Sequence, residues 1–434
     1  MANKSFKGWS CVKREQKAYS LGTGDIRRWY QRDIDQITHS TCFRKLQRKS
    51  QLLSEKDPRS RSRLIHTIEV SRIAMEISEK LGLSKELTEA ICLAHDIGTS
   101  PYGCIGNSFL KKRAKQAFSH EMVGALMLLM ISEKVTDNEK YINDIENLVE
   151  DADFNGQAEI EIPVFPNRLY VSRDIYEKTG PKDPGVRYHI HHISPEIVDG
   201  VFNHGEAGTP NTLEGQVVRF ADNIAYLSQD IEDLFTTDIL EPRIYTRRTG
   251  ESKSLKVGKQ SMSWCDIDSD EMPSLKDAFN ENRGRRIAAF VSRFVEYNLK
   301  QLSADKLKTR TSAILQKEIP ILECDSGMQF VINYIWNFIE RNYSHPLIQT
   351  SNAMQEEKME QLWEIISNGH SDFPGKNPSY LKFMGKANNC SLFKKLESEW
   401  KIAFFISHLS WFDVDLILDS YHERNNTFEL DISY

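Results

Sequence analysis

The chain has 434 residues, of which 40% are hydrophobic and 27% charged, a composition typical of a folded protein with a sizeable core. Its formal net charge of -6 argues against a protein that coats nucleic acid through bulk positive charge. The seven cysteines are scattered without a CxxC pair, which excludes a zinc ribbon and does not fit a secreted disulfide framework.

These features predict a cytoplasmic protein without a membrane segment. The first residues, MANKSFKGWS, lack the apolar region of a signal peptide. The most apolar stretch, 402–412, is far shorter than the ~20 residues that cross a bilayer.

Helical periodicity dominates the N-terminal half. Apolar residues recur at helical spacing over 61–81, and Gly82 follows as a plausible stop. Ser84 is expected to cap a second helix, which runs to His95-Asp96 and ends before Gly98.

Further helices are expected along the chain. Ser119 should cap a third helix, and a fourth is predicted from about 215 to 234. Residues 159–164 alternate like a short strand or hairpin arm, whereas 247–260 resembles an exposed loop. Helical patterns resume near Ser274 and continue to His422.

We therefore expect an all-α fold with one small β hairpin in the middle region. Residues 1–240 should form one helical core. Residues 241–434 should form a helical region that completes the pocket, an oligomer interface, or both.

Four ligand-type side chains lie inside these apolar helical patterns. His66 falls within the first helix, His95 and Asp96 end the second, and Asp222 falls within the fourth. Burying such groups costs several kcal/mol unless something compensates, and a shared divalent ion would compensate all of them. The mixed N/O set suits Mn, Fe, Co, Zn or Mg. The alternative for any single histidine is a core residue satisfied by hydrogen bonds.

Neighbouring residues diverge by about 100° around a helix, so His95 and Asp96 would not normally converge. At a helix end before Gly98 the backbone can unwind, and both side chains can then reach one ion.

The fourth helix carries a row of polar residues on one face, at Asp222, Tyr226, Asp230 and Asp233. This row could be the polar face of an ordinary surface helix. Successive residues of the row could instead bind a metal, a phosphate or sugar, and a hydroxyl group.

Arg63 lies one turn before His66 and should face the same way. Its guanidinium group suits phosphate oxygens, and the alternative is a surface ion pair.

The N-terminal half resembles the deoxynucleoside triphosphate triphosphohydrolases of the HD superfamily, the deoxyguanosine-triphosphatase-like group. The resemblance covers about residues 30–130 and 214–233, and the matching stretches are YQRDIDQITHSTCFRKLQRKSQLL, RSRLIHTIEVSRIA, LTEAICLAHDIG, FSHEMVGALMLL and EGQVVRFADNIAYLSQDIED. The first stretch is specific to this subgroup, and the C-terminal third offers no motif that matches.

This resemblance implies that residues 1–240 form an HD-type metal-dependent phosphohydrolase core. It implies an enzyme that cleaves at the α-phosphate and releases a deoxynucleoside and tripolyphosphate. Its metal ligands would be His66, His95, Asp96 and Asp222. Gln51 and Leu52 would approach the deoxyribose of the substrate, and Arg63 would approach its phosphates. Tyr226 would contact the sugar-phosphate and Asp230 the 3′-hydroxyl.

One stretch departs from the family pattern. The family usually reads HDxGHxPFGHxGE where this chain reads HDIGTSPYGCIGN, so Thr99 and Cys104 replace histidines and Asn107 replaces the acid. The family's His/Glu dyad helps with proton transfer, and such help is worth ~10²–10⁴ in rate. His120 and Glu121 match the family's next helix and are candidates for handling protons.

The sequence leaves three functions open. The first is a deoxynucleoside triphosphate hydrolase that tunes or depletes the nucleotide pool, for example in phage defence. The second is an HD phosphohydrolase that acts on another nucleotide or phosphoester. The third is a nucleotide-sensing protein with a weakened active site. Family members commonly form homo-oligomers and bind an activating nucleotide between subunits. The expected partners are therefore further copies of this chain and an activating nucleotide.

Overall fold

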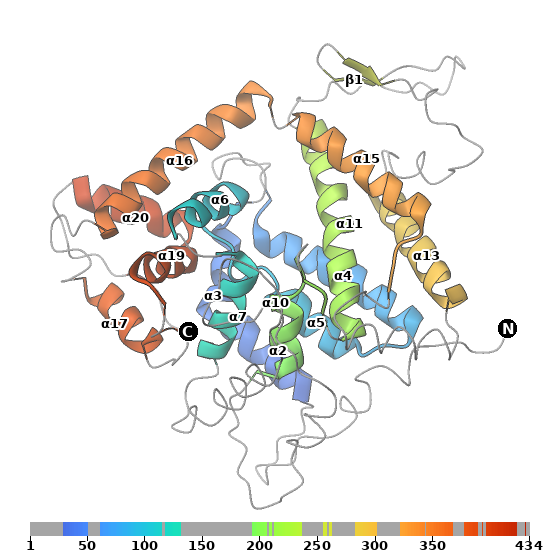
Figure 1. Cartoon of the computed structure of the whole chain (residues 1–434), viewed down its shortest axis with the longest axis horizontal. Helices are drawn as coiled ribbons and strands as arrows, with labels where there is room; N and C mark the ends of the chain where they lie inside the picture. Colours follow the sequence, from blue (N-terminus) through green and yellow to red (C-terminus); the bar gives the residue numbers. More distant parts are fainter. Residues whose placement is uncertain are drawn as a thin grey trace, which may run out of the picture.

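The computed structural model describes residues 29–50, 61–114, 118–131, 193–205, 208–210, 212–236, 255–257, 260–262, 283–301, 322–342, 344–367, 377–388, 393, 396–422 and 430. Within these residues the fold is all-α with one short hairpin, as predicted (Figure 1). The N-terminal helices are α2 (Trp29–His39), α3 (Thr41–Lys45), the 3-10 helix η2 (Leu46–Arg48), α4 (Arg63–Leu81), α5 (Lys85–Ala94), α6 (Gly103–Arg113), α7 (His120–Ile131), α10 (Pro195–Phe202) and α11 (Leu213–Thr236). The later elements are β1 (Leu255–Val257), β2 (Gln260–Met262), α13 (Arg283–Gln301), α15 (Ser326–Asn342), α16 (Pro346–Ser367), α17 (Pro378–Ala387), α19 (Ser398–His408) and α20 (Trp411–His422).

The predicted helix boundaries in the first half are confirmed by their caps. Helix α4 ends at Gly82, whose φ of 74° is the left-handed conformation that glycine adopts most easily. Helix α5 begins after Ser84, whose side chain accepts a hydrogen bond from the Leu87 N–H. Ser119 plays the same part for α7, where its hydroxyl accepts from the Met122 N–H at 3.3 Å.

The sequence analysis predicted no helix at α2, α3, α6 or α10. Helix α6 starts directly after the break at Pro101, and α10 carries Pro195 in its first turn. Proline tolerates that position because the first N–H groups of a helix have no partner within the helix. Helix α10 packs against α5, α7 and α11.

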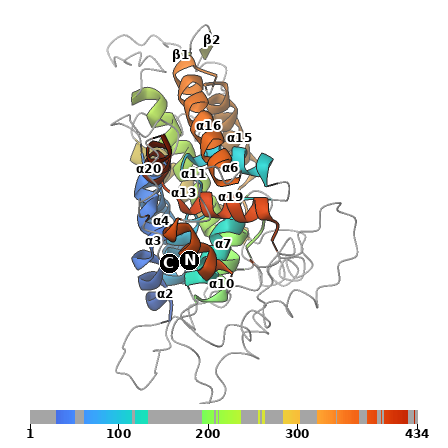
Figure 2. The same ribbon diagram turned by 90° about the vertical axis from the view of Figure 1, so that its left-hand side faces the viewer.

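The hairpin lies in the stretch that the sequence analysis interpreted as an exposed loop or excursion, and the strand pairing there was not predicted. Strands β1 and β2 pair antiparallel, with Leu255 opposite Met262. Leu255 and Val257 alternate with Lys256, and the Gly258-Lys259 dipeptide that separates the strands favours a tight turn. In both views the hairpin lies beyond the ends of α15 and α16 (Figures 1 and 2). The strand predicted at 159–164 lies outside the described residues.

The helices of the second half pack on two sides of the N-terminal ones. Helices α13 and α15 lie along α11, and α16 and α19 contact α6 (Figures 1 and 2). Ion pairs join the halves: Lys45 with Asp413 at 3.1 Å, and Arg113 with Glu360. Among the described residues, no helix combines the length and the apolar character that a membrane span requires.

Candidate metal centre

The ligand-type residues predicted from the sequence converge in the structure. His66 comes from α4, His95 and Asp96 from the turn after α5, and Asp222 from α11. The Nε2 atom of His66 lies 2.9 Å from Oδ1 of Asp222. The Nε2 atom of His95 lies 3.5 Å from Oδ2 of Asp96 and 3.6 Å from Oδ1 of Asp222. The unwound turn after α5 therefore lets adjacent residues face one point, as predicted.

Hydrogen bonds at Nδ1, on the side of each ring away from the carboxylates, fix the orientation of the two imidazoles. The Nδ1 atom of His66 lies 2.9 Å from Oε1 of Gln229, whose amide nitrogen donates to Glu69. The Nδ1 atom of His95 lies 2.6 Å from the Cys92 carbonyl. Because these oxygens only accept, Nδ1 carries the proton in both rings. Nε2 is therefore the nitrogen of each ring that faces the carboxylates, and a ring that loses its Nε2 proton is in the tautomer that binds metals.

The surroundings of His95 Nε2 fit a cation. This atom is buried and has no hydrogen-bond partner among the described residues. A lone pair held 3.5 and 3.6 Å from two carboxylates is repelled by them unless a proton or a metal ion intervenes. HD domains bind divalent metals, and His66, His95 and Asp96 form a possible metal site here. Asp222, the fourth residue predicted as a ligand, places its Oδ1 atom 2.9 Å from Nε2 of His66.

Both carboxylates are ionised. Burial alone would raise the pKa of Asp96, but the Arg63 guanidinium and the neighbouring imidazoles hold it well below its usual range. Burial acts the same way on Asp222, and the neighbouring imidazoles of His66 and His95 hold its pKa well below the usual range. The Asp222 side chain is 26% exposed, whereas those of His66, His95 and Asp96 are 2% exposed or less. Asp222 is therefore the one of the four side chains that solvent reaches.

Arg63 is buried in an ion pair, where the sequence left open a phosphate contact or a surface pair. Its Nη1 atom donates to Oδ2 of Asp96 at 3.1 Å, and its Nη2 atom lies 3.7 Å from Sγ of Cys104. The guanidinium thus orients one predicted metal ligand directly. Cys104 itself is exposed.

The polar row on α11 is not the solvated face of a surface helix, because Asp230 is fully buried. The Tyr226 ring meets His66 edge-on at 6.4 Å and stacks on Trp336 of α15 at 5.1 Å. Tyr226 therefore lies beside the metal ligands, fixed by a residue of the second half. The described residues do not include Gln51 and Leu52, nor do they include the side chain of Asp233.

The residues that replace the family's acid/base groups have structural partners. The Thr99 hydroxyl donates to Oδ1 of Asp96 at 2.7 Å. The Asn107 side-chain oxygen accepts from the Ser100 N–H at 2.9 Å. Thr99 therefore positions a metal ligand, and Asn107 closes the loop before α6.

His120 and Glu121 lie next to the HD turn at the start of α7. A Cβ on Gly98 would come 2.2 Å from the His120 carbonyl oxygen, so this glycine is what lets α7 approach the turn. His204, which follows α10, joins the pair: its Nε2 atom lies 3.3 Å from Nε2 of His120. The sequence analysis missed His204, although it comes directly after a helical apolar pattern at Ile197, Val198 and Val201.

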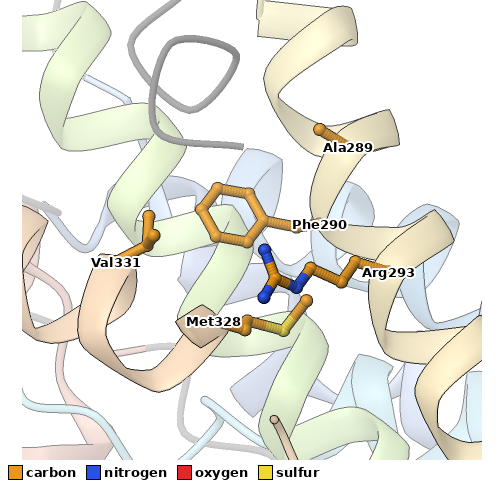
Figure 3. A pocket seen from close by; sticks show the side chains of 5 residues that line it. All are labelled: Ala289, Phe290, Arg293, Met328 and Val331. Carbon is orange, nitrogen blue, oxygen red and sulfur yellow. The ribbon is translucent and has the colours of Figure 1, made fainter. Parts of the chain in front are cut away.

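A small hollow between α13 and α15 lies apart from these residues (Figure 3). Phe290, Arg293 and Met328 form part of its lining. Arg293 is ion-paired with Asp325 at 2.6 Å, so its charge is already neutralised. The hollow contains none of the predicted functional residues.

The site and the fold define a class that the comparisons confirm. The family model of the HD domain matches residues 63–227, which include all four predicted ligands. The chain therefore contains an HD domain.

The resemblance predicted from the sequence is also confirmed. A deoxyguanosinetriphosphate triphosphohydrolase-like protein of Caldanaerobacter subterraneus subsp. tengcongensis is 34% identical over 219 residues, which are 50% of this chain and 49% of that protein. Proteins of the same name from Neorickettsia sennetsu and Geobacter metallireducens are 35% identical over 205 residues and 31% identical over 232. These matches cover 47% and 52% of this chain and 46% and 50% of the two proteins. The chain thus spans about half the length of the curated relatives it matches.

Proposed function

We propose that this chain binds one divalent metal ion at His66, His95, Asp96 and Asp222 and hydrolyses deoxynucleoside triphosphates to a deoxynucleoside and tripolyphosphate. The observation that carries the proposal is the buried Nε2 atom of His95, which faces two ionised carboxylates without a hydrogen bond. The substrate class rests on the names of the relatives.

In this reaction the oxygen of a water molecule attacks the α-phosphorus, and the bond from phosphorus to the 5′-oxygen breaks. A bound divalent ion supplies a nucleophilic water near neutral pH and stabilises charge on the phosphate. The leaving 5′-oxygen takes up a proton, for which His120 and Glu121 are the groups predicted from the sequence.

The residues around the ion have proposed roles that follow from their placement. Arg63 holds Asp96 through Nη1, and Nη2, beside the exposed Cys104, is proposed to meet the phosphates. Tyr226 is proposed to contact the sugar-phosphate, because it lies beside His66 and is only partly buried. Contact of Asp230 with the 3′-hydroxyl stands on the resemblance alone, since its side chain is fully buried.

The test is an assay of the purified chain with Mn²⁺ and each deoxynucleoside triphosphate, singly and mixed. Deoxynucleoside and tripolyphosphate should form in equal amounts. The activity should disappear in Asp222→Asn, which keeps the side-chain shape and removes a charge at the open side of the site. Glu79→Gln is the matched control, because Glu79 is 64% exposed on α4. No product above the Asp222→Asn background would contradict the proposal.

A second candidate, hydrolysis of another nucleotide or phosphoester, is favoured by the hydrogen bonds of Thr99 and Asn107. Thr99 and Asn107 stand where the family has its acid/base groups, and both side chains are engaged in these hydrogen bonds. Proton transfer to the leaving group therefore need not follow the family's pattern. Chromatography of the products separates phosphate, pyrophosphate and tripolyphosphate release. Nucleotide binding by calorimetry without turnover would instead support a sensing protein.

Further parts of the proposal concern the setting. Four cysteines of the described residues, Cys42, Cys92, Cys104 and Cys324, are free thiols, which suits a reducing, cytoplasmic compartment. Depletion of the nucleotide pool, including in phage defence, would follow from the proposed activity. Pool measurements in cells that express the wild type or Asp222→Asn test it. Sedimentation with and without nucleotides tests the expected homo-oligomer and its activator.

A further inference from the structure

Helix α11 contacts both nitrogens of the His66 ring. Asp222 and Gln229 are seven residues apart and so lie on one face of α11, which packs along α4 (Figure 1). The Nε2 atom of His66 lies 2.9 Å from Oδ1 of Asp222, and its Nδ1 atom lies 2.9 Å from Oε1 of Gln229. The place of the proton on this ring therefore depends on what these two side chains accept or donate.

The hydrogen bonds continue beyond Gln229 to the surface of α4. The Gln229 amide nitrogen donates to Oε2 of Glu69, which follows His66 by three residues on the same helix. That carboxylate oxygen is also 3.8 Å from Nη1 of Arg61. Gln229 is fully buried, whereas the side chains of Glu69 and Arg61 are 24% and 18% exposed. A line of polar contacts thus connects a partly exposed carboxylate with a predicted metal ligand.

The Glu69 carboxylate determines which end of the Gln229 amide faces the ring. An amide can present either its oxygen, which accepts, or its nitrogen, which donates. Because a carboxylate accepts hydrogen bonds, Glu69 attracts the amide nitrogen and leaves Oε1 to face His66. Oε1 in turn accepts from Nδ1–H, so Nε2 is the nitrogen that gives up its proton when a metal ion binds.

The second histidine of the centre needs no such support. Nδ1 of His95 lies 2.6 Å from the Cys92 carbonyl, a backbone oxygen that cannot be exchanged for a donor. The amide beside His66 can instead turn and offer its nitrogen. In that arrangement Nδ1 accepts, the ring proton moves to Nε2, and Nε2–H donates to Asp222 in a charge-assisted hydrogen bond. The Nε2 atom is then blocked for a metal ion.

We propose that Glu69 is a positioning residue which, through Gln229, selects the tautomer of His66 that binds the metal ion. Two carboxylates compete for a single ring proton: Asp222 favours it on Nε2, and Glu69 favours it on Nδ1. The competing assignment is that Glu69 only forms a partly exposed ion pair with Arg61, and such pairs are worth little. The inference rests on the proposed function through its metal centre and does not depend on the substrate.

The experiment titrates the metal-free protein with Mn²⁺ by calorimetry. Glu69→Gln keeps the side-chain shape and should lower the affinity by about tenfold or more, as loss of a partner behind a metal ligand does elsewhere. Arg61→Gln removes the ion pair but keeps the amide contact, so it should change the affinity by less than about twofold. Glu79→Gln is the same exchange at a residue of α4 that is 64% exposed. It is the matched control and should titrate like the wild type.

An exchange of the two side chains tests the direction of the hydrogen bonds. In the double variant Glu69→Gln/Gln229→Glu, the carboxylate at position 229 accepts from Nδ1–H of His66, and the amide at position 69 donates to that carboxylate. The ring again has Nε2 available for the ion, so the affinity should return to within about threefold of the wild type. A role confined to the Arg61 ion pair would not be restored, because position 69 no longer carries a charge.

NMR of the metal-free proteins with isotope-labelled histidine locates the proton directly. At a pH at which the His66 ring carries one proton, that proton should lie on Nδ1 in the wild type and the double variant and on Nε2 in Glu69→Gln. Circular dichroism confirms that each variant is folded before it is titrated.

The outcomes separate this inference from the proposed function. Wild-type affinity in Glu69→Gln, a lower affinity with the proton still on Nδ1, or a folded double variant that binds as weakly as Glu69→Gln overturns the inference and leaves the metal centre intact. No Mn²⁺ binding in the wild type overturns both.

Discussion

The Lys49 ammonium group donates a hydrogen bond of 2.7 Å to the carbonyl of Ser407, a residue 358 positions further along the chain. The same nitrogen donates to the carbonyls of Ile97, at 3.4 Å, and of Thr99. These carbonyls belong to the HD turn and to the end of α19. One buried cation therefore joins the backbone beside Asp96 to the second half of the chain.

Lys49→Met should destabilise the fold and loosen the HD turn. Methionine fills a similar volume but leaves three buried carbonyls without their donor, at a cost on the order of 2–4 kcal/mol. Chemical denaturation measures the loss, and metal retention reports the turn. Lys85→Met, at an exposed lysine, should change stability by less than about 0.5 kcal/mol. Equal stability of the two variants would contradict the role given to Lys49.

Thr99→Val should weaken metal binding without unfolding the protein. The hydroxyl orients Asp96 at 2.7 Å, and the loss of such a partner typically reduces metal affinity by about 10–100-fold. Thr99→Ser retains the donor and should bind metal like the wild type. Calorimetric titration of the metal-free proteins with Mn²⁺ compares the three. If valine and serine behave alike, Thr99 does not position the ligand.

Gly98→Ala should be strongly destabilising. The added Cβ would meet the His120 carbonyl oxygen at 2.2 Å and the Gly124 nitrogen at 2.3 Å, so α7 must move away from the HD turn. We expect a loss of roughly 2–4 kcal/mol in the free energy of unfolding. Gly385→Ala is the control, because nothing lies within 4 Å of its Cβ position in α17. That exchange should be neutral or slightly stabilising, and thermal melts of both variants provide the comparison.

His95 should contribute stability to the metal-free protein that is lost between about pH 6.5 and pH 9. Burial lowers the pKa of His95, but Asp96 and Asp222 outweigh it and raise the pKa from 6.5 to about 9. The folded state thus holds a proton that the unfolded chain releases at lower pH. The resulting stabilisation is complete below pH 6.5 and lost as the pH rises through 9, on the order of 3 kcal/mol at most.

A bound metal ion replaces this proton, so the metal-loaded protein should not show the same decline. Denaturation of chelator-treated and Mn²⁺-loaded samples at pH 6.5 and pH 9 makes the comparison. Because the buried Lys49, whose pKa is lowered to about 7, contributes the opposite trend in both samples, the difference between the samples is the readout. Equal pH dependence of the metal-free and the Mn²⁺-loaded protein would show that the carboxylates do not hold a proton on His95.

Asp222→Asn should lower metal affinity by more than about 100-fold. Loss of a residue that only hydrogen-bonds to a metal ligand already lowers metal affinity by about 10–100-fold, and loss of a ligand should lower it further. Its partly exposed side chain makes loss of the fold a smaller concern than at His66 or His95. Metal analysis after gel filtration tests this. Wild-type metal content in the variant would remove Asp222 from the ligand set.

The metal centre was predictable because its residues lie in strongly periodic helices with clear caps. Gly82 and Ser84 mark the turn between α4 and α5, and a histidine or aspartate inside such an apolar pattern needs a partner. The role of Thr99 was not predictable, because a hydroxyl in a loop gives no sign of which carboxylate it will reach. The burial of Arg63 depends on α6, which the sequence analysis did not find.

His204 shows a different limit. A single histidine after a short apolar helix is usually a core residue, and its significance appears only when α10 packs beside the start of α7. The hairpin at β1 and β2 was missed for a related reason, since basic and serine-rich residues surround two short apolar strands. Local composition favoured a loop there, and pairing between the strands prevailed.

The stack of Tyr226 on Trp336 joins the second half of the chain to the candidate metal centre. Trp336 lies outside the stretch that matches the HD domain, yet it supports the aromatic ring beside the metal ligands. Divergence in the second half could thus alter which substrate is accepted while every ligand stays in place. Chimaeras that exchange this half with a relative's should keep their metal and change their preferred nucleotide.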